Sequence, residues 1–164
     1  MCGDVMSNQF TTSKLKKKFM LIMAEDLEIF DLLDGQPAQE PDDLINTKIF
    51  PHIKVDFTPS ESQTYIGLKI DYPSVCKNEL YKNYRLTIMI LSNNGHLKTK
   101  TGDSRTDLLA EEIIELFNWN NTIGFTLELV SDFEDPFNEN FYGRRLVFKS
   151  ITSNSIKNGN KQHD

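Results

Sequence analysis

The sequence predicts a single α+β domain with an antiparallel or mixed five-stranded sheet and two main helices packed on it. At 164 residues, the chain is long enough to bury a core without a metal or a disulfide. Its apolar residues follow a helical period in two segments and strand-like patterns in five others. The strands cluster on either side of the second helix, which favours an α+β fold over a parallel, doubly wound one.

The domain is expected to span residues 13–152. Residues 1–12 have no periodicity and predict a flexible N-terminal arm, while residues 153–164 are polar and predict a disordered C-terminal tail.

The first predicted helix covers residues 15–33, with Ser13 as its cap and Gly35 as its stop. Lysines occupy its first turn and acidic residues lie toward its end, the reverse of what the helix macrodipole favours. Either tertiary packing outweighs this effect, or both helix ends meet partner surfaces.

Three strands are predicted next. Apolar and polar residues alternate over residues 53–57 and again over residues 66–72, so each strand turns one face to the core and the other to water. Residues 84–91 are apolar on both faces, as expected of a central strand covered on both sides.

The second predicted helix begins at Ser104 and carries an apolar stripe from Leu108 to Phe117. Two further strands are expected, one at residues 125–129 and one around Leu146 and Phe148. A long loop, residues 131–143, is expected to join them.

Net charge, cysteine content and the length of the apolar runs argue against several classes of function and site. A net charge of −6 disfavours sequence-independent DNA binding by the isolated chain, except near the lysines at positions 14, 16, 17 and 18. Cys2 and Cys76 suggest neither a disulfide framework nor a zinc site, which fits a reducing cytosol. The apolar run at residues 19–24 is too short to span a bilayer, so no membrane association is expected.

No enzymatic activity, cofactor, catalytic residue or metal ligand is predicted. The sequence contains no phosphate-binding glycine loop, metalloprotease helix or nucleophile elbow. The histidines, His52, His96 and His163, are expected to be solvated or structural, because no base-orienting partner is near them in sequence. A carboxylate metal site assembled from distant residues such as Asp71, Asp103 or Glu128 stays open as an alternative, and it would require these residues to converge in space.

The strongest functional signal is a set of candidate interface residues. The aromatics of the 131–143 loop must either fold back on the domain or enter a partner, and aromatic residues with arginine are enriched at interface hot spots. The arginines can instead be edge charges that prevent aggregation. The lysines can face DNA in a channel, an acidic partner or solvent. The predicted interface residues are Phe133, Phe137, Phe141, Tyr142, Arg144, Arg145, Lys16 and Lys17.

The order of these elements resembles the tail-terminator and tail-completion proteins of long-tailed phages. The segments that carry the resemblance are the helix at 15–33, the proline-introduced strand at 51–57, the strand at 84–92, the helix beginning near 105–107, and the closing strand, loop and strand at 125–130, 131–143 and 144–151. The resemblance covers residues 15–151 and is one of topology and residue pattern, without an invariant motif. The chain departs from the pattern in its longer arm, a proline-rich segment around Pro37 and Pro41, and a polar tail.

The resemblance implies a virion structural protein of the phage neck, assembled in the bacterial cytoplasm as a hexameric ring. Such a ring would stack on the last tail-tube subunits and face the head connector or a portal-associated protein, with DNA passing through its lumen without sequence specificity. Two alternatives stay open. One is a connector or adaptor on the portal. The other is an acidic phage inhibitor that presents Glu111, Glu112 and Glu115 in place of nucleic acid.

Overall fold

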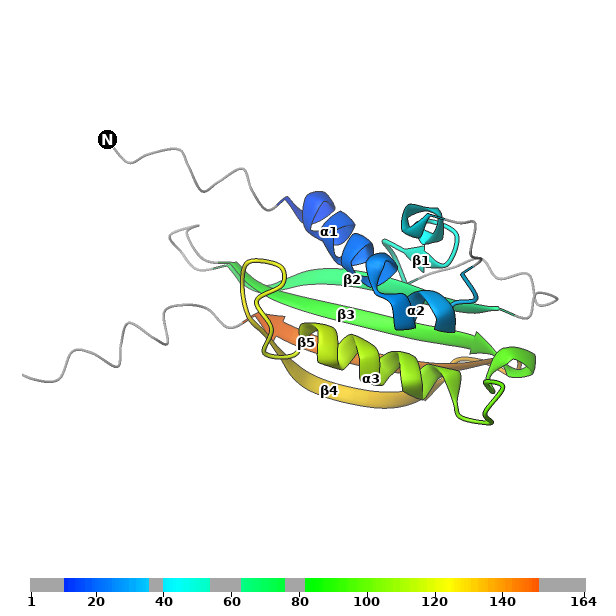
Figure 1. Cartoon of the computed structure of the whole chain (residues 1–164). Helices are drawn as coiled ribbons and strands as arrows, with labels where there is room; N and C mark the ends of the chain where they lie inside the picture. The colour runs from blue at the N-terminus through cyan, green and yellow to red at the C-terminus, as the bar shows by residue number, and fades with distance from the viewer. Residues whose placement is uncertain (1–10, 36–39, 54–62, 76–81, 151–164) are drawn as a thin grey trace, which may run out of the picture.

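The computed structural model describes residues 11–35, 40–53, 63–75 and 82–150. It is an α+β domain in which five strands form one mixed sheet in the order β1-β2-β3-β5-β4 (Figure 1). The strands are β1 (Ile49–Phe50), β2 (Thr64–Val75), β3 (Lys82–Asn93), β4 (Leu127–Pro136) and β5 (Phe141–Ser150). The helices are α1 (Thr12–Glu25), α2 (Leu27–Leu32) and α3 (Arg105–Phe117), with 3-10 turns η1 (Pro41–Leu44) and η2 (Asn94–His96). The predicted fold class is confirmed.

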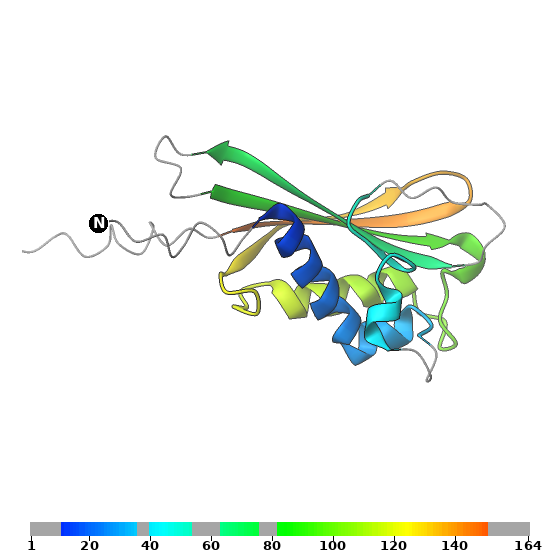
Figure 2. The ribbon, with the colours of Figure 1, turned by 90° about the horizontal axis from the view of Figure 1, so that it is seen from above.

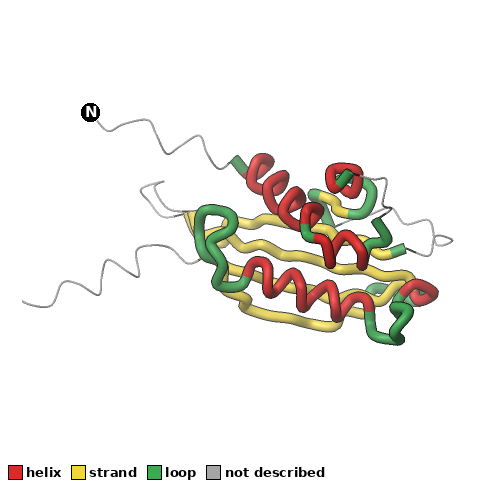
Figure 3. Tube along the Cα trace, viewed as in Figure 1, coloured by secondary structure: helices red, strands yellow, loops and turns green. Residues whose placement is uncertain are grey.

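All three helices lie on one face of the sheet, as Figures 2 and 3 show. Alternate residues of the three inner strands are buried beneath them, including Leu68, Ile88 and Phe148. From the helices, Phe19 of α1 and Phe117 of α3 meet edge to face, with ring centroids 5.2 Å apart. Burying each such side chain stabilises the fold by roughly 1.5–3 kcal/mol. The core is therefore the single layer between helices and sheet.

The single first helix predicted for residues 15–33 is wrong. Asp26 adopts an extended conformation that ends α1, and its carboxylate accepts hydrogen bonds from the Glu28 and Ile29 amides at 3.1 and 3.0 Å. Asp26 thus caps α2 and places negative charge where the macrodipole favours it. Thr11, rather than Ser13, caps α1. The break removes part of the unfavourable charge pattern expected of one helix.

Most of the strand predicted at residues 53–57 lies outside the described residues. The first strand described is β1, which pairs in parallel with β2 through Ile49 opposite Ile66 and Phe50 opposite Gly67. Ile53 lies outside any strand, and residues 54–57 are outside the described part of the chain. The parallel pairing of β1 is what makes the sheet mixed.

The predicted domain ends are only partly in view. Residues 1–10 of the predicted arm and all of residues 153–164 lie outside the described ranges. Thr11 and Thr12, assigned to the arm, instead cap and begin α1.

The long loop predicted at residues 131–143 is instead mostly a β-hairpin. Strand β4 continues to Pro136 and pairs antiparallel with β5, with Phe133 opposite Arg145 and Pro136 opposite Tyr142. In the turn, the Asn138 side chain accepts hydrogen bonds from the Asn140 and Phe141 amides. Charged residues and a proline are tolerated because β4 is the edge of the sheet.

The chain crosses the open face of the sheet just after β1, at the glycine of β2. A Cβ atom on Gly67 would lie 2.7 Å from the His52 carbonyl oxygen and 3.0 Å from the Ile53 Cα. Beside this crossing, the Phe50 and Tyr65 rings lie 6.0 Å apart. Gly67 therefore allows the 51–53 segment to rest directly on the sheet.

We predict that Gly67→Ala destabilises the domain by about 1–3 kcal/mol, because the added methyl group overlaps backbone that has to move. Urea unfolding followed by circular dichroism measures the change. Lys69→Ala, an exposed position on the same strand and face, is the matched control. Equal stability of the Gly67 variant and the unchanged protein would contradict the tight crossing.

Candidate functional site

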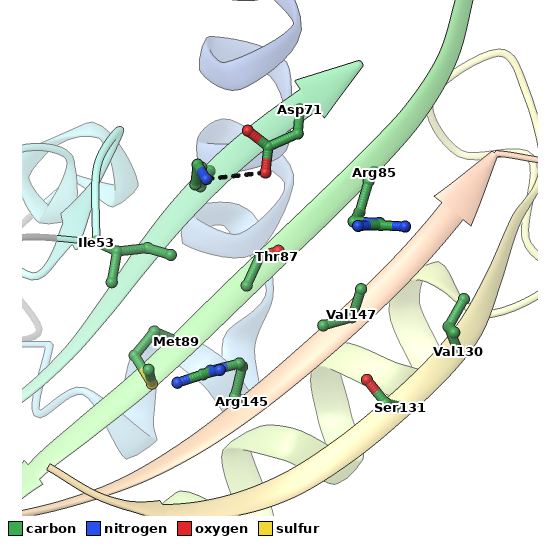
Figure 4. Close-up of a pocket in the computed structure, with 10 residues that line it drawn as sticks. Ile53, Asp71, Arg85, Thr87, Met89, Val130, Ser131, Arg145 and Val147 are labelled. Carbon is green, nitrogen blue, oxygen red and sulfur yellow. Dashed lines mark ion pairs between the residues drawn. The ribbon is translucent and has the colours of Figure 1, made fainter. Parts of the chain in front are cut away.

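A groove of about 480 Å³ lies on the face of the sheet opposite the helices. Figure 4 shows its lining side chains, which come from the 51–53 segment and from β2, β3, β4 and β5. This open-face groove is lined by Ile53, Lys69, Asp71, Arg85, Thr87, Met89, Val130, Ser131, Arg145 and Val147.

Strand alternation explains why these residues share one face. Thr87 pairs with Lys69 on one side and with Val147 on the other, while their neighbours Leu68, Leu86 and Leu146 point into the core. On the edge strand, a register irregularity between Leu129 and Ser131 disturbs the alternation, and Val130 and Ser131 both reach the groove.

Basic side chains outnumber acidic ones among the described lining residues of the groove, although the whole chain is acidic. Lys69, Arg85 and Arg145 are the basic residues, and Asp71 is the acidic residue of this described lining. Lys69 Nζ lies 3.0 Å from Asp71 Oδ2, and both side chains keep considerable contact with solvent. Arg85 and Arg145 are both exposed, so their guanidinium groups line the groove in contact with solvent.

Apolar surface accompanies the charge. Met89 is buried in the groove floor, and Figure 4 shows it beside Arg145, its cross-strand partner. At the sheet edge, Val130 is 55% exposed and Phe133 is 59% exposed. The groove thus combines arginines with exposed hydrophobic residues, a composition typical of protein interfaces.

The structure separates the predicted interface residues. Phe133 and Arg145 are cross-strand neighbours at the groove, and Phe137 is exposed in the hairpin turn. Phe141 was expected in an accessible loop but is buried at 3% exposure within its own domain, because it begins β5. Tyr142 is half-buried, and desolvation followed by its hydrogen bond with Glu134 raises its pKa.

The two predicted lysines differ in their surroundings. Lys16 donates a hydrogen bond from Nζ to the Pro51 carbonyl at 2.7 Å, so it ties α1 to the segment after β1. Lys17 is exposed on α1. Neither lies among the residues of the open-face groove.

Arg144 is an interior tie, which here means a side chain that connects two elements of the domain, and it does not line the groove. Its guanidinium bonds both oxygens of Asp132, at 2.7 and 2.8 Å, and also bonds Asp107 in the first turn of α3. These carboxylates raise its pKa. Arg144 therefore joins the β4–β5 hairpin to α3, a role that the sequence analysis did not predict.

A second polar cluster surrounds His96. Its Nδ1 lies 2.9 Å from the Thr64 hydroxyl, which lies 2.8 Å from the Ser92 hydroxyl. Its Nε2 lies 2.5 Å from Asp34 Oδ2, and Arg105 Nη1 lies 3.2 Å from the other Asp34 oxygen. Burial, then repulsion from Arg105, lowers the pKa of His96 against the opposing effect of Asp34.

This cluster has the residue types of a hydrolase triad, but its hydroxyls are out of reach. Thr64 and Ser92 are fully buried, so no substrate can approach them. The cluster instead holds the C-terminal end of α2 to the ends of β2 and β3, which agrees with the structural alternative expected for His96. No local sequence pattern predicts this cluster, because its five residues come from separate parts of the chain.

An acidic surface lies on the helix side. Glu112 of α3 shares a hydrogen bond with Glu28 of α2, and Asp26 and Glu115 are close enough to repel it. The hydrogen bond with Glu28, then burial and the repulsion, raise the pKa of Glu112 to about 7. Four carboxylates from two helices therefore crowd into one place.

Nothing in the described ranges brings the alternative metal residues together. Asp71 is on β2, Glu128 is on β4 and paired with Lys149 at 2.8 Å, and Asp103 accepts a hydrogen bond from Thr101. The described residues contain no group of three or more His, Cys, Asp or Glu side chains placed to hold a metal ion. None of the helices described is both long and apolar enough to cross a membrane.

A model of the YomW family, a Bacillus phage-derived protein family, matches residues 26–150. The matched range begins at the cap of α2 and ends with the last residue of β5, so it contains α2, α3 and the whole sheet. No curated protein matches the chain. The family match indicates a phage-related protein.

We predict that Arg144→Met destabilises the domain by about 1–3 kcal/mol, because Asp132 and Asp107 lose their shared partner in a half-buried site. Thermal unfolding measures the loss. Arg145→Met, one residue along the same strand but facing the groove, is the control and should cost clearly less. Equal losses would contradict the assignment of Arg144 as the interior tie.

We predict that the Glu28–Glu112 contact makes stability depend on pH. Because the folded-state pKa of Glu112 is raised, its contribution is fully present below pH ~4.5 and is lost as the pH rises through about 7. Glu112→Gln should therefore stabilise the protein at pH 8, by less than ~1 kcal/mol for this solvent-screened pair, and bring no gain at pH 4.5. Urea unfolding at both pH values checks this. Glu111→Gln, its exposed neighbour, should not reproduce the pattern.

Proposed function

The chain belongs to the YomW family, and we propose that it is a structural protein of the phage neck, where it forms a ring that terminates the tail tube and joins it to the head connector. The family match supports the phage association. The open face of the sheet supports the assembly role.

The observation that carries this proposal is the sheet face that no described helix covers, together with its exposed apolar edge. Helices cover one face only, and Val130, Phe133 and Phe137 remain exposed along β4 and the hairpin turn. A monomer leaves these side chains in water, whereas a neighbouring subunit would bury them. A stable contact buries about 800 Å² per partner, so a neighbouring subunit would have to cover sheet-face residues as well as this edge.

The sheet edge gives the neighbour a second means of attachment. Strand β4 is the last strand of the sheet, so one side of its backbone has no strand beside it in the described structure. Such an edge can pair with another chain. Contacts between different surfaces of identical subunits close into a ring when the rotation allows it, and we propose six subunits.

The ring would meet the tail-tube protein on one side and the connector or a portal-associated protein on the other. Lys14, Lys17 and Lys18 lie exposed in the first turns of α1 and are suited to line a lumen that DNA crosses without sequence specificity. Lys18 is also anchored, because its Nζ donates to the Ile123 carbonyl at 3.2 Å. We place the assembled ring in the virion.

One different class of function has an observation in its favour. The crowded carboxylates of α2 and α3 form an acidic surface that can imitate nucleic acid, as an inhibitor of a DNA-binding enzyme would. An inhibitor of this kind needs no ring in order to act. The oligomeric state of the purified protein therefore separates the inhibitor from the ring-forming structural protein.

The connector alternative is tested separately. Cross-linking of the chain to portal protein rather than to tail-tube protein would favour a connector on the portal.

We predict that the purified protein forms a ring of defined size, alone or once tail-tube protein is added, measured by light scattering and electron microscopy. Phe133→Ser with Phe137→Ser should raise the concentration needed for assembly about tenfold or more, because each loses apolar surface from the contact. Trp119→Ser, which alters another exposed aromatic residue outside the groove and the hairpin, is the control. Monomers at every concentration, with tube protein present, would refute the ring.

A further inference from the structure

The turn of the β4–β5 hairpin is fastened to η2 by Asn94. This residue begins η2 and donates a hydrogen bond from Nδ2 to the Glu139 carbonyl at 2.8 Å. Its backbone amide donates to the Asn140 carbonyl at 2.9 Å. Both acceptors belong to the turn between β4 and β5, so Asn94 holds that turn at two adjacent points.

The turn that Asn94 holds carries part of the proposed assembly contact. Phe137 is 46% exposed in this turn, and Phe133 is 59% exposed on the strand that leads into it. A contact residue that is held in place before a partner arrives loses less conformational entropy on binding. The bonds from Asn94 therefore prepare the hairpin for a neighbouring subunit.

The residue after Asn94 makes this fastening chemically labile. Gly95 follows it, and both residues are exposed. The backbone nitrogen of a glycine can attack a preceding asparagine side chain, because glycine has no side chain to obstruct the approach. The Gly95 nitrogen loses its proton and bonds to Asn94 Cγ, and ammonia leaves. Water then opens the cyclic imide at either carbonyl, which gives aspartate or isoaspartate without any oxidant.

Deamidation would remove the side-chain donor that fastens the turn. The product at position 94 carries a carboxylate, which accepts hydrogen bonds and has none to give to the Glu139 carbonyl. A hydrogen bond is lost, and repulsion between two oxygens takes its place. Both changes favour release of the turn from η2.

The fold restrains this reaction as long as the turn is fastened. The Asn94 side chain is held on the Glu139 carbonyl, and the Gly95 amide donates to the Asn93 side chain at 2.9 Å. The attacked group and the attacking nitrogen are thus both engaged elsewhere. Local opening of the turn has to come before the attack.

We propose that the Asn94-Gly95 pair is a deamidation site that unfastens the β4–β5 hairpin and thereby disables the assembly contact. The inference rests on the proposed ring, because a neighbour that covers the hairpin keeps the turn closed and Asn94 intact. Chains left outside rings lose Asn94 progressively. The site is therefore a slow, irreversible switch that separates assembled from unassembled chains.

Rates of deamidation test the site. The protein below and above its assembly concentration, and a synthetic peptide of residues 91–98, are incubated in one mildly alkaline buffer. Mass spectrometry of the fragment that contains Asn94 measures its conversion. Unassembled protein should react about tenfold or more slowly than the peptide, because the turn must open first, and rings should react more slowly still. Equal rates in peptide and unassembled protein, or no conversion in the latter, would overturn the switch.

A Gly95→Ala variant tests whether this reaction disables assembly. It keeps Asn94 and its bonds, and Gly95 is not among the described glycines with positive φ, so alanine fits its backbone. The variant should form rings like the unchanged protein. It should also keep that capacity through an incubation after which the unchanged protein, held unassembled, has lost it. Equal loss in both proteins would contradict the proposal.

An Asn94→Asp variant tests the consequence directly. Its assembly concentration should rise about threefold to tenfold, and hydrogen exchange at the Asn140 and Phe141 amides should quicken, because the turn has lost a hydrogen bond. Asn120→Asp is the matched control, since Asn120 Nδ2 also donates to a backbone carbonyl, that of Glu115 at 3.1 Å, but in the loop after α3. The control makes the same charge change away from the hairpin, so it should assemble normally.

The outcomes separate the switch from the ring. Circular dichroism melting establishes that each variant is folded. Wild-type rings from Asn94→Asp, or equal weakening by both aspartate variants, overturn the switch while the ring stands. An unchanged protein that stays monomeric at every concentration, with tail-tube protein present, overturns both.

Discussion

Packing of α1 and α3 against a single face of the sheet is the interaction on which the rest of the structure depends. It buries the alternate apolar residues of β2, β3 and β5. The Phe117 ring of α3 lies edge to face against both Phe19 of α1 and Phe148 of β5. The same alternation sends every second residue of those strands to the other face. Where that face lacks a helix, it carries Lys69, Arg85 and Arg145, so the groove is a direct consequence of one-sided burial.

The first turn of α3 fixes the helix layer to the sheet at two points. Arg105 bonds the Leu32 carbonyl and Asp34 at the end of α2, and through Asp34 it joins the His96 cluster at the ends of β2 and β3. Two residues later, Asp107 meets Arg144, which holds Asp132 of β4. These half-buried ties resist sliding of the layers, because movement would leave charges without partners. The sheet face opposite them can then be a rigid docking surface.

Sequence periodicity predicted β2 because burial of one face imposes an alternation, and it predicted β3 from a run of residues that are apolar on both faces. It missed the break at Asp26, since the apolar spacing continues across it and only the cap marks the new start. It missed the β4–β5 hairpin because edge strands tolerate charge and proline. Phe133 and Phe141 look alike in sequence, yet the hairpin register exposes one and buries the other. The His96 cluster depends on contacts between residues far apart in sequence, which no local pattern encodes.

The carboxylates crowded between α2 and α3 repel one another and make this part of the domain sensitive to pH. Glu28 and Glu112 are held close enough to share a hydrogen bond, and their neighbours are carboxylates, so the helix layer carries repulsion that no cation of α2 or α3 relieves. Protonation of Glu112 relieves part of this repulsion, because the hydrogen bond with Glu28, followed by burial and the repulsion itself, raises the pKa of Glu112 to about 7.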